Sequence, residues 1–287
     1  MKIVVALLTL VAFGCRDSVE TRIAQEIVRV DASLKASEKA KLNEEIRDLP
    51  KLYREALDKA RGEQPVDLKL YRLRNAAVGA DLLAFINEHP DASEKDLAAL
   101  TKLWNERRVA YDKPAEAVRG PLLHRALAES SRDRAEKLFR ASLPYAKVSS
   151  PFSGVYYLAE AEGNRRFAEF VASLPGRESG PSPRRDRVEA ALQKLEAETL
   201  VAFGSDPTAT KMIPVSAKLK EAREQLGAGA IDGAALSLLE AHRRFSGAED
   251  TTVLPSLAAL AAEQQPVATK KVLPASVTVT LVRWPYT

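Results

Sequence analysis

Apolar residues recur along most of this chain at steps of three and four, the spacing that places them on one face of a helix. The first such run contains Val19, Ile23, Ile27, Val30 and Leu34, and most of the positions between them are polar or charged. This alternation of one apolar stripe with a hydrophilic remainder predicts an amphipathic helix that buries one side only.

The apolar phase is lost near residues 36–37 and resumes from Leu42 to Ala60, where Gly62 can end the helix. Two interpretations fit this pattern, an extended coiled-coil stalk or the first hairpin of a helical bundle. A sustained coiled coil needs three or four uninterrupted heptads. The interruption therefore favours the bundle.

A third helix is predicted over residues 66–88, because His89-Pro90 is a helix stop. Ser93 and Asp96 have the spacing of a capping box, with Asp96 in place of the usual Glu or Gln, and we expect the next helix to follow it.

A further helix is predicted from Leu123 to about Leu143, where Pro144 should stop it. Ser150-Pro151 then starts the most aromatic helix of the chain, over residues 152–174. Its aromatic stripe favours packing against a neighbouring helix, and a binding surface is the alternative. The candidate binding residues are Tyr156, Tyr157, Phe167, Phe170 and, near the end of the chain, Trp284.

Ser216 is expected to cap a helical hairpin over residues 216–245, with a turn at residues 227–230. Small residues on it would let two helices approach closely: Ala222, Ala234, Ala235 and Ala241. In spacing and in these alanines the hairpin resembles a tetratricopeptide-type unit. No second copy recurs at a fixed period, as a repeat architecture would require.

Residues 276–284 alternate in the manner of a strand and are rich in β-branched residues. A single strand needs partners for its backbone groups. We therefore expect this tail either to dock on the helical body or be disordered or, as the alternative, to add to a sheet edge of another protein.

The chain opens with Lys2, an apolar run over residues 3–13 and a small residue, Gly14, before Cys15. The run is too short to cross a hydrocarbon core, which takes about 20 apolar residues. A positive start, a short apolar segment and a small residue are the parts of an export signal.

Residues 11–15 resemble the lipobox of bacterial lipoproteins, although Ala12 and Phe13 differ from its commonest residues. The resemblance implies that Cys15 carries a diacylglycerol and becomes the first residue after cleavage. Cys15 is the only cysteine, so it has no disulfide partner in the chain. An ordinary cleaved signal peptide and an uncleaved membrane-lying segment are the alternatives. Arg16, rather than Asp, follows Cys15, which in such lipoproteins implies the outer membrane, facing the periplasm.

A Pro-, Gly- and Ser-rich stretch near residue 180 divides the rest of the chain. The predicted organisation is a signal peptide (1–14), an N-terminal helical region (15–174), a linker (175–184), a C-terminal helical region (185–263) and a tail (264–287). Strong helix formers dominate nearly every segment. The fold class expected is all-α, a helical bundle or helical-hairpin array with a short strand-like tail.

Lysine and arginine total 43 against 39 acidic residues, a formal net charge of +4. The charges are interleaved, which is typical of a solvated surface, and export argues against a nucleic-acid partner. His89, His124 and His242 are far apart in the sequence, and no His-Glu-x-x-His or Gly-x-Ser-x-Gly motif occurs. We therefore expect no metal, no cofactor and no enzymatic activity, with the carboxylates on solvated helical faces.

These features predict a lipid-anchored envelope protein that acts as a non-enzymatic helical binding or scaffold module. It would attach to the membrane through Cys15 and bind an unknown envelope protein or polymer. One alternative is a carrier that holds a small apolar ligand between the aromatic helix and its neighbours. A second alternative is an envelope hydrolase that uses carboxylates alone.

Overall fold

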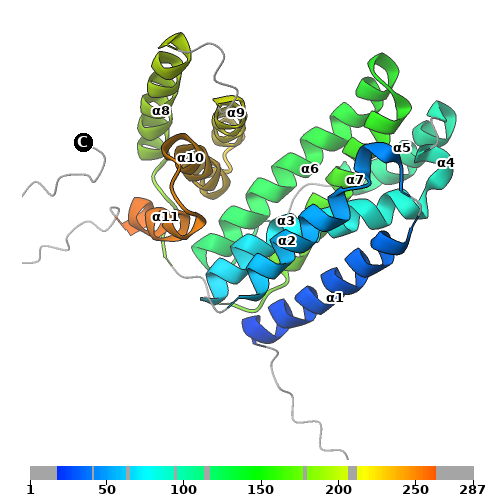
Figure 1. The fold of residues 1–287 in the computed structure, drawn as a ribbon. Helices are drawn as coiled ribbons and strands as arrows, with labels where there is room; N and C mark the ends of the chain where they lie inside the picture. Colours follow the sequence, from blue (N-terminus) through cyan, green and yellow to red (C-terminus); the bar gives the residue numbers. More distant parts are fainter. Residues whose placement is uncertain are drawn as a thin grey trace, which may run out of the picture.

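A computed structural model describes residues 18–40, 42–62, 65–93, 96–112, 117–176, 180–205 and 212–262. Over these ranges the chain is built of helices without a β-strand (Figure 1), so the predicted all-α fold is confirmed. Cys15, the strand-like segment 276–284 and Trp284 lie outside the described residues. Within the ranges above, no helix combines the length and apolar character that crossing a bilayer requires.

The N-terminal helices pack against one another as a bundle. In chain order they are α1 (Val19–Lys39), η1 (Glu44–Ile46), α2 (Leu49–Arg61), α3 (Val66–Glu88), α4 (Pro90–Ser93), α5 (Leu97–Tyr111), α6 (Leu122–Val148) and α7 (Pro151–Ala172). Helix α3 contacts α1, α2 and α7, and it is buried on most of its surface. The interruption after α1 is thus a turn into α2, as the bundle interpretation requires.

Two glycines let the bundle close around α3. A Cβ atom on Gly79 would collide with the ring of Tyr53 from α2. A Cβ atom on Gly163 of α7 would lie 2.5 Å from the carbonyl oxygen of Val78. Helices α3 and α7 therefore cross so closely that only glycine fits at position 163.

Helix α6 does not stop at Pro144, contrary to the sequence prediction, but continues to Val148. Proline removes one backbone donor and crowds the preceding turn, which destabilises a helix interior by about 3 kcal/mol. Tertiary packing offsets this cost, because the last two turns of α6 lie against α7. Ala146 is buried there, at the position where a Cβ atom on Gly154 would collide with it.

Local capping follows the sequence at some helix starts and departs from it at others. The Ser150 hydroxyl accepts a hydrogen bond from the Ser153 N–H at 3.1 Å, as predicted. Asp96 is itself the N-cap of α5 and accepts from the Ala98 N–H at 2.8 Å, so the capping box expected to begin at Ser93 was wrong.

The C-terminal helices are α8 (Arg185–Ser205), α9 (Ile213–Gly227), α10 (Ile231–Ser246), η3 (Asp250–Thr252) and α11 (Val253–Ala262). Helices α9 and α10 form the predicted hairpin, with Gly229 at φ 85° in its turn. Helix α9 begins at Ile213, so Ser216 lies inside the helix instead of capping it; Pro214, in the first turn, is compatible with this earlier start.

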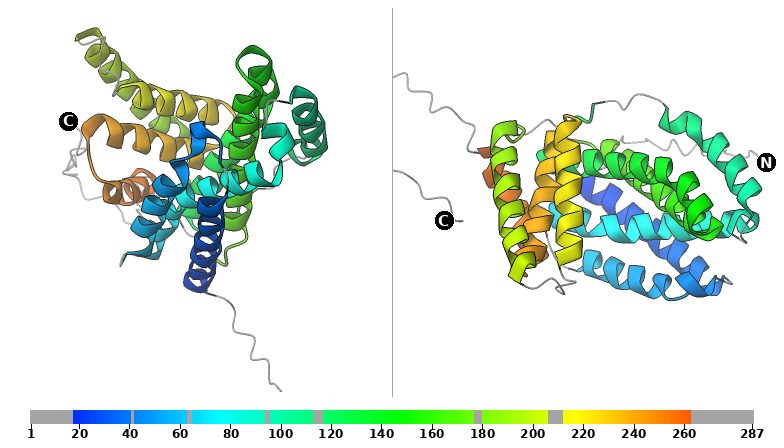
Figure 2. Two further views of the ribbon diagram at one scale, coloured as in Figure 1. Left: turned by 45° about the vertical axis from the view of Figure 1, so that its right-hand side comes forward. Right: turned by 90° about the horizontal axis from the view of Figure 1, so that it is seen from above.

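The C-terminal helices lie against one side of the N-terminal bundle (Figure 2). Helix α10 crosses α6 closely, because a Cβ atom on Gly233 would lie 3.0 Å from the backbone nitrogen of Ser130. The segment predicted as a linker connects α7 to α8. The regions on its two sides are nevertheless in direct contact, through α6 and α10.

Candidate functional site

The four candidate binding residues of α7 fall into two groups. Phe167 is 1% exposed and belongs to the hydrophobic core, and Phe170 is half-buried, with its ring centroid 6.2 Å from that of Phe167. These two rings pack inside the protein. Tyr156 and Tyr157 lie nearer the start of α7 and are only partly buried.

Tyr156 and Tyr157 belong to a cluster of tyrosines that spans three helices. The ring of Tyr157 lies 4.8 Å from that of Tyr145 on α6 and 6.4 Å from that of Tyr156. Tyr156 in turn hydrogen-bonds through its side chain to Tyr53 of α2. Burial, followed by the neighbouring Tyr156, raises the pKa of Tyr53, so its hydroxyl stays protonated in the physiological range.

Tyr145 was not among the predicted site residues. Its side chain is 43% exposed, and Val148, one turn further on, is 83% exposed. With Ala141 and Pro144, which are also exposed, they form an apolar stripe at helical spacing on the outer face of α6. The stripe was missed because the helix was predicted to stop at Pro144. We call Tyr145, Val148, Tyr156 and Tyr157 the distal tyrosine surface.

The end of α6 and the start of α7, which carry the distal tyrosine surface, lie at the opposite end of the N-terminal bundle from the start of α1 (Figure 1). Ser18 caps α1 by accepting from the Thr21 N–H at 3.1 Å, and Arg22 donates to the Ser173 hydroxyl at 3.1 Å, just past the end of α7. The start of α1 is thus tied to the end of α7. Because α7 has 22 residues, its two ends are about 33 Å apart.

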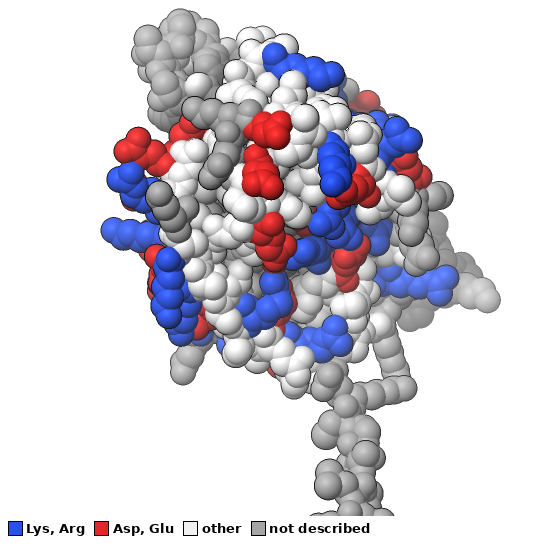
Figure 3. Space-filling model, turned by 90° about the vertical axis from the view of Figure 1, so that its right-hand side faces the viewer, with Lys and Arg blue, Asp and Glu red and all other residues white. Residues whose placement is uncertain are grey.

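Charges of both signs are interspersed over the face of the molecule seen in Figure 3, in agreement with their interleaving in the sequence. Not every carboxylate is on that solvated surface, however. Several acidic side chains are buried, and each has basic or polar partners: Asp81 with Arg29 and Arg166, Glu162 with Arg165 and Tyr111, Asp232 with Arg125, and Glu221 and Glu240 with Lys218. The expectation that the acids lie on solvated faces was wrong for these residues.

Glu221 and Glu240 are two buried carboxylates that share one cation. Lys218 Nζ lies 2.8 Å from a carboxylate oxygen of each, and Arg74 pairs with Glu240. Burial acts to raise the pKa of both carboxyls, but the nearby cations outweigh it and both pKa values are lowered. A hydrolytic pair needs one carboxyl that holds its proton near neutral pH. Here both are ionised and neutralised, so the cluster is suited to holding helices together.

The three histidines remain apart in the fold. Burial lowers the pKa of His89, His124 and His242, and the charge of Arg107 adds to this effect at His89. Among the described residues, no group of three or more His, Cys, Asp or Glu side chains is arranged to hold a metal ion.

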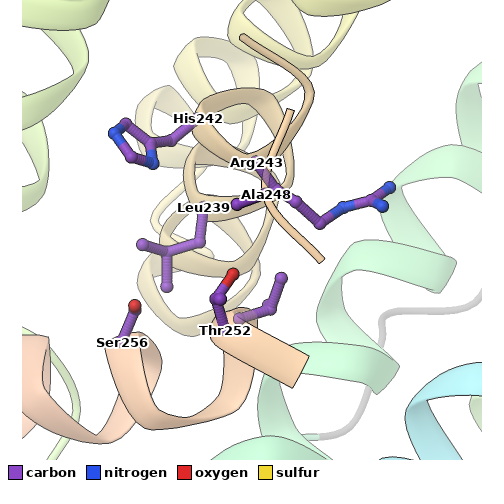
Figure 4. A pocket seen from close by; sticks show the side chains of 7 residues that line it. Leu239, His242, Arg243, Ala248, Thr252 and Ser256 are labelled. Atoms are coloured by element: carbon purple, nitrogen blue, oxygen red, sulfur yellow. The ribbon is translucent and has the colours of Figure 1, made fainter. Parts of the chain in front are cut away.

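A cavity of about 210 Å³ lies between α10, η3 and α11 (Figure 4). None of the predicted aromatic residues lines it. Ligand pockets are usually about 300–1,000 Å³, so it is small. Figure 4 shows His242 and Arg243 extending in opposite directions, and the Arg243 guanidinium pairs with Asp250 at 2.5 Å.

No protein-family model, curated protein or solved structure matches this chain. The function of the chain therefore rests on its own residues and their geometry.

Proposed function

We propose that this chain is a lipid-anchored protein of the bacterial cell envelope, held in the outer membrane through Cys15, and that it works as a non-enzymatic helical binding module. The distal tyrosine surface is the part that contacts an envelope protein or polymer. The observation that carries this proposal is the placement of that surface at the far end of the N-terminal bundle from the start of α1.

The proposed anchor is close in sequence to the first helix of the folded body. Cys15 stands three positions before Ser18, the cap of α1. A lipid on Cys15 would therefore hold the start of α1 close to the bilayer, and two or more acyl chains give stable attachment. The distal tyrosine surface would then face away from the membrane, at a height of about one α7 length, roughly 33 Å.

The chemistry of that surface suits binding. Tyrosine is enriched at protein interfaces because its large, rigid ring offers apolar contact and its hydroxyl offers a hydrogen bond. The rings of Tyr145 and Tyr157 already pack against each other at a tilt of 54°, which restricts both side chains before binding. The two alternatives gain less support: Phe167 is packed in the core instead of lining a ligand space, and Glu221 and Glu240 are neutralised by cations.

The anchor is tested by Cys15→Ser in cells, with Ser18→Ala as the control that leaves the cysteine in place. We expect Cys15→Ser to abolish acylation and signal cleavage and to release the folded protein from the outer-membrane fraction, whereas Ser18→Ala behaves as the wild type. Unchanged processing and membrane sedimentation of Cys15→Ser would exclude lipid anchoring.

The surface is tested by placing a photo-cross-linking amino acid at Val148 in intact cells. The matched control is Val28, which is 69% exposed on α1 and lies outside the distal tyrosine surface. We expect a discrete cross-linked species from position 148 that is absent from position 28. No adduct at 148, or the same adducts at both positions, would contradict the assignment of this surface.

A further inference from the structure

The contact between the N-terminal bundle and the C-terminal helices is sorted by charge. Within the described residues, four ion pairs join the two sides, and each places its cation on α3 or α6 and its carboxylate on the C-terminal side. They are Arg72–Asp250, Arg74–Glu240, Arg125–Asp232 and Lys137–Glu224. The four pairs therefore share one orientation, although the acidic Glu129 of α6 also lies at this contact.

Polar groups fill much of the remaining contact. The Ser130 hydroxyl of α6 donates to a Glu221 oxygen at 3.2 Å, and the Gly233 N–H of α10 donates to a Glu129 oxygen at 2.9 Å. The buried apolar residues near the start of α10 are Ala234 and Ala235, which bury little area, and Leu236, which is also fully buried. Much of this contact is therefore polar, while the apolar residues of both sides belong to one continuous hydrophobic cluster.

Arg125 joins the parts that meet at this contact. Its Nε lies 2.6 Å from Asp232 at the start of α10 and its Nη1 donates to the Gly120 carbonyl at 2.8 Å. Its Nη2 reaches the Gly180 carbonyl at 3.5 Å and the Ser182 hydroxyl at 3.4 Å, on the segment that leads to α8. The Arg125 side chain therefore contacts both the segment that leads into α8 and the start of α10, the helix that packs on α6.

We infer that α8 to α11 form a latched unit, which separates from α3 and α6 as an intact helical body with Arg125 as the latch. Buried ion pairs contribute little net stability, since desolvation offsets their attraction. On separation, Arg74, Arg125 and their carboxylate partners recover water. Helices α8 to α11 also contact one another, and Leu192, Leu219 and Leu257 are buried among them, within a hydrophobic cluster that continues into the N-terminal bundle. Contacts within a chain that are largely polar favour relative motion of the parts.

Separation would uncover the four cations of α3 and α6 that carboxylates of α9, α10 and η3 otherwise cover, together with Glu129 of α6. The C-terminal helices thus cover these side chains, and whether they stay in place depends on the contacts of Arg125. This device is independent of the lipid anchor and of the distal tyrosine surface.

The test is native-state hydrogen exchange read by mass spectrometry, on wild type, Arg125→Gln and Arg29→Gln. The control is matched at the carboxylate: Arg29 pairs with Asp81 at 2.7 Å inside the N-terminal bundle, and Asp81 and Asp232 both have side chains that are 3% exposed. Arg29 is more exposed than Arg125, and Arg166 stays near Asp81 in this variant, so its effect should be the smaller one. We expect Arg125→Gln to speed exchange throughout α8–α11 on the order of a hundred-fold, the effect of leaving a buried charge unpaired, with exchange in α3 and α7 unchanged. Arg29→Gln should speed exchange in the bundle instead.

If Arg125→Gln fails to fold, hydrogen exchange of the wild type alone still tests the inference. In wild type, the amides of α8–α11 are expected to exchange together and with less protection than those of α3 and α7, while the helical circular dichroism is retained. Equal protection in both parts, with Arg125→Gln speeding exchange everywhere alike, would show a single cooperative unit and overturn the latch.

Discussion

Two helix crossings in this protein use a glycine for close approach, yet they are stabilised differently. At the α3/α7 crossing, Gly163 meets the Val78 carbonyl, and most of the buried residues on both helices are apolar. At the α6/α10 crossing, Gly233 lies against Glu129 and Ser130, beside the Arg125–Asp232 pair. We therefore expect the stability of the first crossing to depend on side-chain volume, and the stability of the second to depend on whether each buried charge keeps its partner.

The comparison teaches which changes each contact tolerates. In an apolar crossing, an added or deleted carbon changes the packing directly. In a polar crossing, the important quantity is whether every buried donor and acceptor keeps a partner. Substitutions that remove one partner should therefore have the largest effects at the polar contacts of α10 with α6 and α3, and substitutions that change volume should have theirs at α3/α7.

The largest effect is expected from Glu240→Gln. It leaves Arg74 and Lys218 facing a neutral amide in a buried site, and breaking one partner of a buried ion pair costs about 3–5 kcal/mol. Urea denaturation followed by circular dichroism gives the free energy of unfolding. A loss below about 1 kcal/mol, the range of exposed pairs, would show that this cluster is solvated.

The next largest effect is expected from Gly163→Ala. The new methyl group meets a backbone carbonyl, which cannot rotate away, so we expect a loss of about 2–3 kcal/mol by overpacking. Gly227→Ala is the control, because a Cβ atom there meets nothing within 4 Å and alanine favours a helix. Thermal melting should shift in opposite directions for the two variants; a shift in the same direction would contradict the close crossing.

The acid side of the stability curve tests the buried charges on the two sides of α10, where Glu240 pairs with α3 and α9 and Glu129 of α6 meets Gly233. Because nearby cations hold the pKa of Glu240 below its ordinary value of 4.5 against the opposing effect of burial, its contribution is complete above that value and is lost as the pH falls below it. Burial raises the pKa of Glu129, so its protonation acts in the opposite sense at higher pH. We expect Glu240→Gln to flatten the fall in stability below about pH 4.5, and Glu129→Gln to leave that fall in place. Identical slopes in both variants would contradict these assignments.

The smallest effect on stability is expected at the distal tyrosine surface. Val148→Ser should change the free energy of unfolding by no more than about 0.5 kcal/mol, since the side chain is largely exposed. It should nevertheless reduce partner cross-linking from position 145. A large loss of stability would mean that Val148 is packed against something within the chain.

The sequence predicted the parts of the fold that depend on local rules. The span 66–88 coincides with α3, and Ser150 caps α7, because helix periodicity and side-chain caps are readable from a few neighbouring residues. Pro144 was misjudged because packing of α6 on α7 outweighs a local cost. The mistake also concealed Tyr145, whose exposure became interpretable only with the helix extended to Val148.

The buried carboxylates could not be found in the sequence for a different reason. Asp81 and Glu240 stand in helices whose composition resembles that of many solvated helices. Their partners, Arg29 and Arg74, are far away in the chain, and only the packing of helices brings them together. Long-range pairing of charges leaves no periodic signal in a single sequence.

Mass spectrometry of the protein extracted from its native membrane tests the anchor, on which the orientation of every surface depends. The account predicts that the first residue is Cys15 and that it carries a diacylglycerol on its sulfur. A chain that retains residues 1–14, or an unmodified Cys15, would contradict it.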